Sequence, residues 1–378
     1  LISAEMEHRK QKPKTPESAF KARTTAERDP PRVTHVHVRG NFLVKGDVVQ
    51  QGTPKVLPPL PPSETSGGRP NRLDLARWLV NDTNPLTARV IVNRVWQQHF
   101  GRGLVVTDDD FGTQGEAPSH PELLDWLAFQ FRRNGWSLKQ LHRLIVTSAT
   151  WRQASIVRPD LADRDPLNKW LARQNRLRVE AEIIRDLALS VGGLLHPKIG
   201  GPSVYPPQPA NRVKLGFQKS VSWPVSEGPD RYRRGLYTFF QRTVPYPMLI
   251  EFDAADSNTS CTRRERSNTP LQALTLLNDP VFVECAQALG QRIVVAAPDR
   301  RIDYLFRICL SRRPTQRERA VLSRLYVTQR KRYESDPRSA AQLIGKTNTV
   351  TAEMVADVAA SISLARVVMN LDEFITRE

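Results

Sequence analysis

Apolar residues recur at the spacing of an α-helix through most of the chain from residue 71 onward. One stripe follows Asn84-Pro85, a cap followed by proline, and ends near Phe100-Gly101. Its members are Ala88, Ile91, Val92, Val95 and Trp96. Further helices are predicted over residues 119–135, 138–150 and 178–193, after Pro270 and Pro280, and from there to the C-terminus. The pattern therefore predicts a mainly α, multi-helix body.

Residues of the types that cap helices stand at the predicted helix starts. Ser119, with Glu122 three residues later, has the spacing of a capping box, and Ser137 is placed to cap the following helix. Two further starts combine a cap with proline, at Thr269-Pro270 and at Asp279-Pro280.

Two segments are predicted to be extended instead. Residues 33–50 alternate in polarity around Gly40-Asn41, which is typical of a small β-hairpin. His35 and His37 then share one face of a strand, an exposed face unless a third ligand joins them. A second short strand is predicted near residues 235–243.

A long irregular loop is predicted over residues 195–235, which are rich in Pro and Gly and carry Tyr205, Phe217 and Trp223. Such a loop is either pinned by its aromatic side chains over a site or loosely ordered. We expect it to lie over the helices and to meet the arginine-rich residues 257–268.

Composition divides the chain into four segments. Residues 1–32 form a polar connector, residues 33–55 contain the β-hairpin, and residues 56–70 are a Pro- and Gly-rich linker. Residues 71–378 form the helical domain.

The charge of the chain favours anionic partners. Its 56 Lys and Arg residues outnumber 39 Asp and Glu, which gives a formal net charge of +17 at pH 7. The basic residues are spread through almost every predicted element, without an RNA-binding motif or a zinc finger. One interpretation is therefore a non-enzymatic basic binding or scaffold module for anionic polymer, with polysaccharide favoured over nucleic acid.

Several classes of protein lack their signatures in this sequence. No nucleophile elbow, phosphate-binding loop or dinucleotide fingerprint is present, and no CxxCH motif would attach haem. No apolar run reaches the roughly 20 residues of a membrane span. The sequence begins at Leu1 without the pattern of a signal peptide, so we expect it to be a piece of a larger product.

The first group of candidate site residues lies between two predicted helices. His99 ends one helix and His120 begins the next, and the intervening segment carries Asp108, Asp109, Asp110 and Glu116. His99, Asp108, Asp110 and His120 are candidate metal ligands, although their spacing matches no metal motif. The alternative is a structured loop whose carboxylates are solvated or cap neighbouring groups.

The second group is the arginine-rich segment SNTSCTRRERSNTP, residues 257–270. Cys285 and Cys309 fall at core positions, whereas Cys261 stands beside Arg263 and Arg264, whose charges would favour a thiolate. Cys261 is thus a candidate nucleophile or redox thiol. Alternatively it anchors the loop, while the arginines, Arg266 included, bind helix carbonyls or carboxylates such as Asp253 and Asp256.

We expect any functional cleft to bring both groups together. Its candidate catalytic residues are His99, Asp110, His120, Cys261, Arg263, Arg264 and Asn268.

Three stretches carry a family resemblance. NPLTARVIVNRVWQQHFGRG and the residues after it, RRERSNTPLQALTLLNDPVFVECAQAL, and LARVVMNLDEFITRE resemble the C-terminal domain of unknown function of planctomycete cytochrome-c-associated proteins, the PSD-one type. The resemblance, which covers most of residues 33–378, implies upstream partners in the same polypeptide: an export signal, a cytochrome-c-like module with haem c, and a companion domain. It implies an extracytoplasmic protein, an accessory or catalytic unit in redox-linked breakdown of complex polymers. It supplies no catalytic residues.

Overall fold

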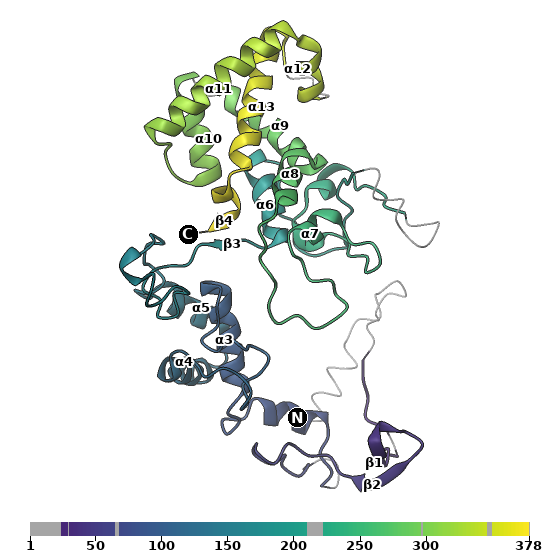
Figure 1. Ribbon diagram of the computed structural model, residues 1–378. Coiled ribbons are helices and arrows are strands. Elements are labelled where there is room, and N and C mark those ends of the chain that lie inside the picture. Colours follow the sequence, from purple (N-terminus) through teal and green to yellow (C-terminus); the bar gives the residue numbers. More distant parts are fainter. Residues whose placement is uncertain are drawn as a thin grey trace, which may run out of the picture. The chain divides into compact units, whose positions relative to one another are not determined.

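The computed structural model describes residues 24–28, 30–64, 68–209, 222–295, 298–345 and 350–377. The chain divides into two compact units between Arg89 and Val90. Twelve α-helices and two small antiparallel strand pairs occur in the described residues, which confirms a mainly helical protein with an N-terminal hairpin (Figure 1). The strands are β1 (Thr34–His37), β2 (Lys45–Val49), β3 (Leu177–Arg178) and β4 (Thr376–Arg377). The helices are α2 (Arg72–Leu79), α3 (Thr87–Phe100), α4 (Pro121–Arg133), α5 (Leu138–Val146), α6 (Ala181–Gly192), α7 (Pro247–Glu251), α8 (Pro270–Asn278), α9 (Pro280–Val295), α10 (Arg301–Leu310), α11 (Gln316–Ser335), α12 (Pro337–Ile344) and α13 (Val355–Met369).

The first unit contains the hairpin and α2. His35 pairs with Val48 across the two strands, and its Nδ1 lies 3.0 Å from the carbonyl oxygen of Gly46. Helix α2 begins with a capping box in which Asn71 is the cap. The buried indole of Trp78 donates to the carbonyl of Pro58 at 2.9 Å, so the Pro-rich segment before α2 is held against the helix.

In the second unit, α3 ends as predicted and α4 does not begin as predicted. The Gly101 N–H bonds the carbonyl of Gln97, and Gly101 has a φ of 78°. The capping box at Ser119 is wrong: α4 starts at Pro121, with His120 at the cap position and no side-chain cap bond. Proline has no N–H and its fixed φ suits the first helical position, so it sets the helix start two residues later. Ser137 caps α5 as expected.

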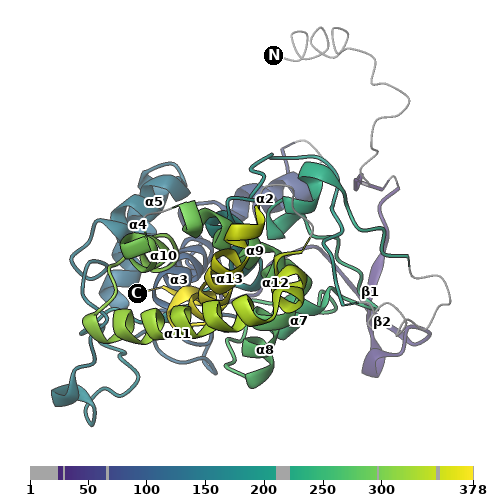
Figure 2. The same cartoon turned by 90° about the horizontal axis from the view of Figure 1, so that it is seen from above.

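The main core of the second unit is built from α6 to α11 and α13. The predicted starts of α8 and α9 are confirmed, since Thr269 forms a capping box and the Asp279 carboxylate accepts from the Val281 N–H. Helix α13 lies beside α9 and α11 (Figures 1 and 2). Gly290 of α9 makes this packing tight, because a Cβ there would lie 2.5 Å from Ile362 Cγ1 and 2.8 Å from its Cα.

Aromatic side chains pin the described part of the long loop. Trp223 stacks on Tyr246 with ring centroids 5.6 Å apart, and Tyr205 stacks on Phe239 at 4.9 Å. Phe217 lies outside the described residues. Arg233, fully buried, donates to the carbonyls of residues 198, 200 and 202. The loop is therefore held by Arg233 at its own far end and by aromatic side chains from the residues that follow it.

The strand predicted near residues 235–243 is wrong. Gly235–Tyr237 is a single 3₁₀ turn, after which the Phe239 N–H bonds the carbonyl of Val204 as part of one isolated bridge. A Cβ on Gly235 would lie 2.5 Å from the carbonyl oxygen of Glu182, and the Gly235 N–H donates to Asp186 at 2.6 Å. This contact with α6 fixes the turn and overrides the local strand preference.

Strands β3 and β4 join distant parts of the second unit. Leu177 pairs with Arg377 and Arg178 with Thr376, so the chain end lies beside the segment that enters α6 (Figure 1). Among the described helices, none combines the length and the apolar character needed to cross a bilayer.

Candidate functional site

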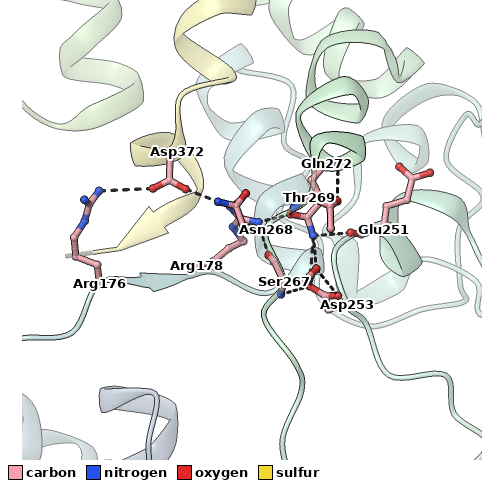
Figure 3. A network of polar contacts seen from close by, with 9 residues as sticks. All are labelled: Arg176, Arg178, Glu251, Asp253, Ser267, Asn268, Thr269, Gln272 and Asp372. Carbon is pink, nitrogen blue, oxygen red and sulfur yellow. Dashed lines mark hydrogen bonds and ion pairs between the residues drawn. The ribbon is translucent and has the colours of Figure 1, made fainter. Parts of the chain in front are cut away.

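The arginine loop, residues 257–268, is fixed at its C-terminal end by a polar network (Figure 3). The carboxylate of Asp253 accepts from both the N–H and the hydroxyl of Ser267, at 2.8 Å and 2.9 Å. Gln272, buried in the first turn of α8, donates to the carbonyl of Glu251 at 2.8 Å. These bonds hold the end of the loop against α7 and α8.

Arg178 of β3 completes the network (Figure 3). Its guanidinium group donates to the carbonyl of Ser267 at 2.6 Å, to Asn268 Oδ1 at 3.0 Å and to Asp372 Oδ1 at 3.2 Å, and it also bonds Gln272. Asn268, a candidate catalytic residue in the sequence, therefore has a structural partner that orients its amide.

A second anchor lies in the middle of the loop. Arg264 bonds both carboxylate oxygens of Glu182, at 2.7 Å and 3.2 Å, and its Nη1 lies 3.5 Å from Glu180. The hydrogen bond that Arg264 donates to Glu182 is the first cause that raises the pKa of Arg264. The sequence predicted an arginine that anchors the loop through carboxylates, but its partners are on α6 and at its start, not Asp253 or Asp256.

Held in this way, the loop forms one wall of a cavity of about 530 Å³, here called the arginine recess. It is lined by Gln97, Gln98, Gly101, Glu180, Ala255 and residues 261–266. Its walls thus come from the end of α3, the start of α6 and the arginine loop.

The recess presents hydrogen-bond donors that have no partner among the described residues. Arg263 and Arg266 are exposed and form no ion pair with a described residue. Gln97 is only 7% exposed, yet its side-chain amide makes no hydrogen bond with a described residue. Two glutamates, Glu180 and Glu265, also line the recess, and Glu180 already forms an ion pair with Arg264. Guanidinium and amide N–H groups in this arrangement suit an anion.

Arg377 of β4 adds positive charge beside the recess. Its Nη2 donates to the carbonyls of Gln98 and His99, at the C-terminal end of α3 where backbone acceptors are left over. Burial lowers the pKa of Arg377, and the nearby charge of Arg266 lowers it further. Arg377 therefore counters the negative end of the α3 dipole, which would otherwise repel an anion.

Cys261 is an exposed thiol in the wall of the recess, and its Sγ donates to the carbonyl of Arg263 at 3.2 Å. Next to it, the Thr262 hydroxyl donates to Asp108 Oδ1 at 3.3 Å. Cys285 is fully buried and Cys309 is partly buried against the main core, and burial raises the pKa of each thiol to about 12. The prediction that these two cysteines are core residues is confirmed.

His99 has a different environment from that of the recess. Its Nε2 lies 2.8 Å from His142 Nδ1, and its ring contacts Trp151 edge-on with centroids 4.9 Å apart. Burial, then the neighbouring His142 and Arg377, lower the pKa of His99 to about 4. His99 is linked to the surroundings of the recess by its backbone carbonyl, which accepts a hydrogen bond from Arg377, and not by a ring nitrogen.

The remaining candidates stay within the loop between α3 and α4. Asp110 Oδ1 accepts from the Gly112 N–H at 2.7 Å, and His120 Nδ1 lies 3.0 Å from Ser119 Oγ. Asp108 is buried and contacts the arginine loop through the Thr262 hydroxyl. Among the described residues, no three His, Cys, Asp or Glu side chains gather as a metal site would require.

The two sequence groups therefore meet only in part. Cys261, Arg263 and Arg264 line the recess, whereas His99, Asp110 and His120 are not among its lining residues. Sequence reasoning missed Gln97, Arg178 and Arg377. Arg178 and Arg377 lie in strands of only two residues each, too short to recognise from a pattern without the pairing.

A smaller cavity of about 280 Å³ adjoins the arginine recess, with Arg266 in the wall of both. The other residues that line it are Arg176, Leu177, Arg178, Ser267, Asn268, Asp372 and Thr376. Together the two cavities form a polar surface that continues past the arginine loop.

Comparison with known protein families gives one result. The family model described as PSD1, protein of unknown function (DUF1553), matches residues 71–326. No curated protein and no solved structure matches the chain.

Proposed function

The chain belongs to the PSD1 family of proteins of unknown function (DUF1553). We propose that it is a binding module whose arginine recess holds the acidic groups of an anionic polysaccharide. The observation that carries this proposal is that Arg263 and Arg266, on a loop fixed at two points, form no ion pair with any described residue. A loop that is already ordered loses little conformational entropy when it binds.

The chemistry of the recess favours binding over nucleophilic catalysis. Cys261 is the nucleophile available, but no histidine is among the described residues that line the recess. A thiol needs a base or a strongly perturbing environment to attack a substrate efficiently. The arginines and the amide of Gln97 need no such partner to bind carboxylate or sulfate groups.

A polymer suits the surface better than a small anion. The recess is open and continues through Arg266 into the adjoining cavity, where Arg176 also lies. A chain that carries an acidic group on successive sugars would occupy both cavities. Its hydroxyl groups would meet the polar side chains of Ser267, Asn268 and Gln98.

The biological setting is part of the proposal. As an accessory unit, the module would hold an exported, cytochrome-c-linked protein on the polymer that it helps to degrade. This setting derives from the family resemblance, and absorbance of haem c in the full-length polypeptide would test it.

The test of the binding function uses dextran sulfate, with neutral dextran as the matched uncharged polymer and a DNA duplex as the competing polyanion. Titration calorimetry with the chain should give an affinity for dextran sulfate that falls as salt increases, and none for dextran. The double variant Arg263→Gln/Arg266→Gln should lose on the order of tenfold or more, since hydrogen bonds to charged groups contribute about 1.5–3 kcal/mol each.

The control variant is Arg324→Gln/Arg338→Gln, which removes the same charge from exposed arginines of α11 and α12. It should change the affinity by less than about threefold, as expected for screened surface charges. Equal losses in both double variants would contradict a specific recess. Tighter binding of DNA that depends on Arg263 and Arg266 would assign the site to nucleic acid.

A further inference from the structure

Helix α10 borders a second basic cavity, of about 860 Å³, here called the α10 groove. Arg300, Tyr304, Arg307 and Ile308 recur at intervals of three and four residues and so share one face of the helix. The opposite face, with Leu305 and Phe306, is buried in the core. Among the described residues, none lines both this groove and the arginine recess.

The charge of the groove is strongly positive. Its four arginines face one acid, Asp303, whose carboxylate is taken up by Arg319 at 2.5 Å and 2.9 Å. Arg307 and Arg313 form no ion pair with a described residue, and Arg300 has only the exposed Asp299 at 4.0 Å. Three cationic groups are thus available to an incoming ligand.

The charges of these arginines act together on Asp303. The hydrogen bond from Arg319 is the first cause of the lowered pKa of Asp303, and the charges of Arg313 and Arg307 lower it further. The carboxylate of Asp303 is already paired with Arg319, so the guanidinium groups around it repel each other. An additional acidic group from a ligand would relieve that repulsion.

Apolar side chains also line the groove. Tyr304 and Ile308 are partly buried and pack against the core, which keeps them in place. The Tyr304 hydroxyl accepts a hydrogen bond from Arg292 at 3.3 Å, so its ring is oriented. Arginines around an apolar surface can bind a ligand that carries both carboxylates and an apolar side chain.

We propose that the α10 groove binds an acidic protein segment, whose carboxylates pair with Arg300, Arg307 and Arg313 and whose apolar side chain covers Tyr304 and Ile308. A peptide combines these two features, as amphipathic segments do when they lie in a groove. A sulfated polysaccharide would satisfy the arginines but leave the apolar surface exposed.

A display library of random twelve-residue peptides tests the proposal. The library is selected on the full chain after depletion on the variant Arg307→Gln/Arg313→Gln, whose fold is checked by circular dichroism and thermal unfolding. The enriched peptides should combine several Asp or Glu residues with Leu, Ile or an aromatic residue. In fluorescence anisotropy their affinity should fall at least tenfold in the variant.

Two controls locate the site. Neither Arg324→Gln/Arg338→Gln nor Arg263→Gln/Arg266→Gln should weaken peptide binding by more than about threefold, since both leave the groove intact. The proposal is overturned if no peptide distinguishes the chain from Arg307→Gln/Arg313→Gln, or if the enriched peptides are not acidic. It is equally overturned if Arg307→Gln/Arg313→Gln loses affinity for dextran sulfate instead of for the peptides, because the groove then binds polysaccharide.

Discussion

Arg264 and Glu182, 82 residues apart in sequence, form a two-pronged ion pair whose nitrogen–oxygen distances are 2.7 Å and 3.2 Å. Their side chains are 30% and 22% exposed, so solvent screens the pair only in part. Because Glu182 lies in the first turn of α6, the pair ties the middle of the arginine loop to a core helix. This ion pair therefore helps to hold Arg263 and Arg266 in the wall of the recess.

The first prediction concerns that ion pair. Glu182→Gln should lower the free energy of unfolding by about 1–2 kcal/mol, less than for a fully buried pair because of the partial exposure. Arg264→Gln should cost a similar amount, and the double variant less than the sum, which urea unfolding measures. The exposed pair Arg158–Asp160 is the control and should show a smaller coupling. Strictly additive losses at Glu182 and Arg264 would contradict the coupling.

The second prediction concerns the packing of α9 on α13. Gly290→Ala should lower the free energy of unfolding by about 1–3 kcal/mol, the usual cost of overpacking a core. The new Cβ would meet backbone atoms of Ile362, which cannot rotate away as a side chain would. Gly52→Ala is the matched control, because nothing lies within 4 Å of its Cβ position. If Gly290→Ala unfolds at the same urea concentration as the wild type, the packing of α9 on α13 leaves room for a Cβ at this position and the prediction is wrong.

The starts of α8 and α9 were the most predictable part of the fold because their signals are local. Thr269 and Asp279 each cap a helix whose next residue is proline, and both features lie within a few residues of sequence. The strand expected after residue 235 failed for the opposite reason. Its course is set by the contact of Gly235 with Glu182, which no local pattern contains.

The candidate site was predictable to a similar extent. The density of arginines marked Arg263 and Arg264 directly, since both belong to one loop. Gln97 lies beside an apolar helical stripe and resembled any polar neighbour of a core position. Arg377 reaches the end of α3 only because β4 pairs with β3, a ladder of two residues. Long-range contacts therefore decide which polar residues share a cavity.

The third prediction concerns pH and His99. Its pKa is about 4 in the folded protein, against an ordinary value of 6.5. Well above pH 6.5 the ring is neutral in both states and contributes no pH dependence. Between pH 6.5 and 4 the unfolded chain binds a proton that the folded protein does not, so stability falls as pH falls. After allowance for partial exposure, the loss should be about 1–2 kcal/mol by pH 4.

The measurement is the difference between wild type and His99→Gln in urea unfolding at several pH values. Only wild type carries the titrating ring, so the difference isolates it from the carboxylates that titrate in the same range. His142 and Arg377, the other charged or titratable groups that face the ring, are unchanged in both proteins. A difference that is constant from pH 7 to pH 4 would contradict the lowered pKa.

The fourth prediction concerns the three thiols. Iodoacetamide should modify one cysteine of the folded protein, Cys261, and all three in urea. Cys261 is exposed, whereas Cys285 is buried and Cys309 is partly buried. Burial raises the pKa of each of these two thiols to about 12, so they form little of the reactive thiolate. Cys261→Ser should abolish labelling of the folded protein, as mass spectrometry would show.

The same reaction reports on the arginine recess. Because Cys261 and Arg263 line one cavity, dextran sulfate held by the arginines should cover the thiol and slow its alkylation, whereas neutral dextran should not. In Arg263→Gln/Arg266→Gln the protection should be lost while Cys261 stays accessible. Protection that persists in this variant would place the polymer elsewhere on the protein, since the thiol would then be covered without the two guanidinium groups that the recess offers.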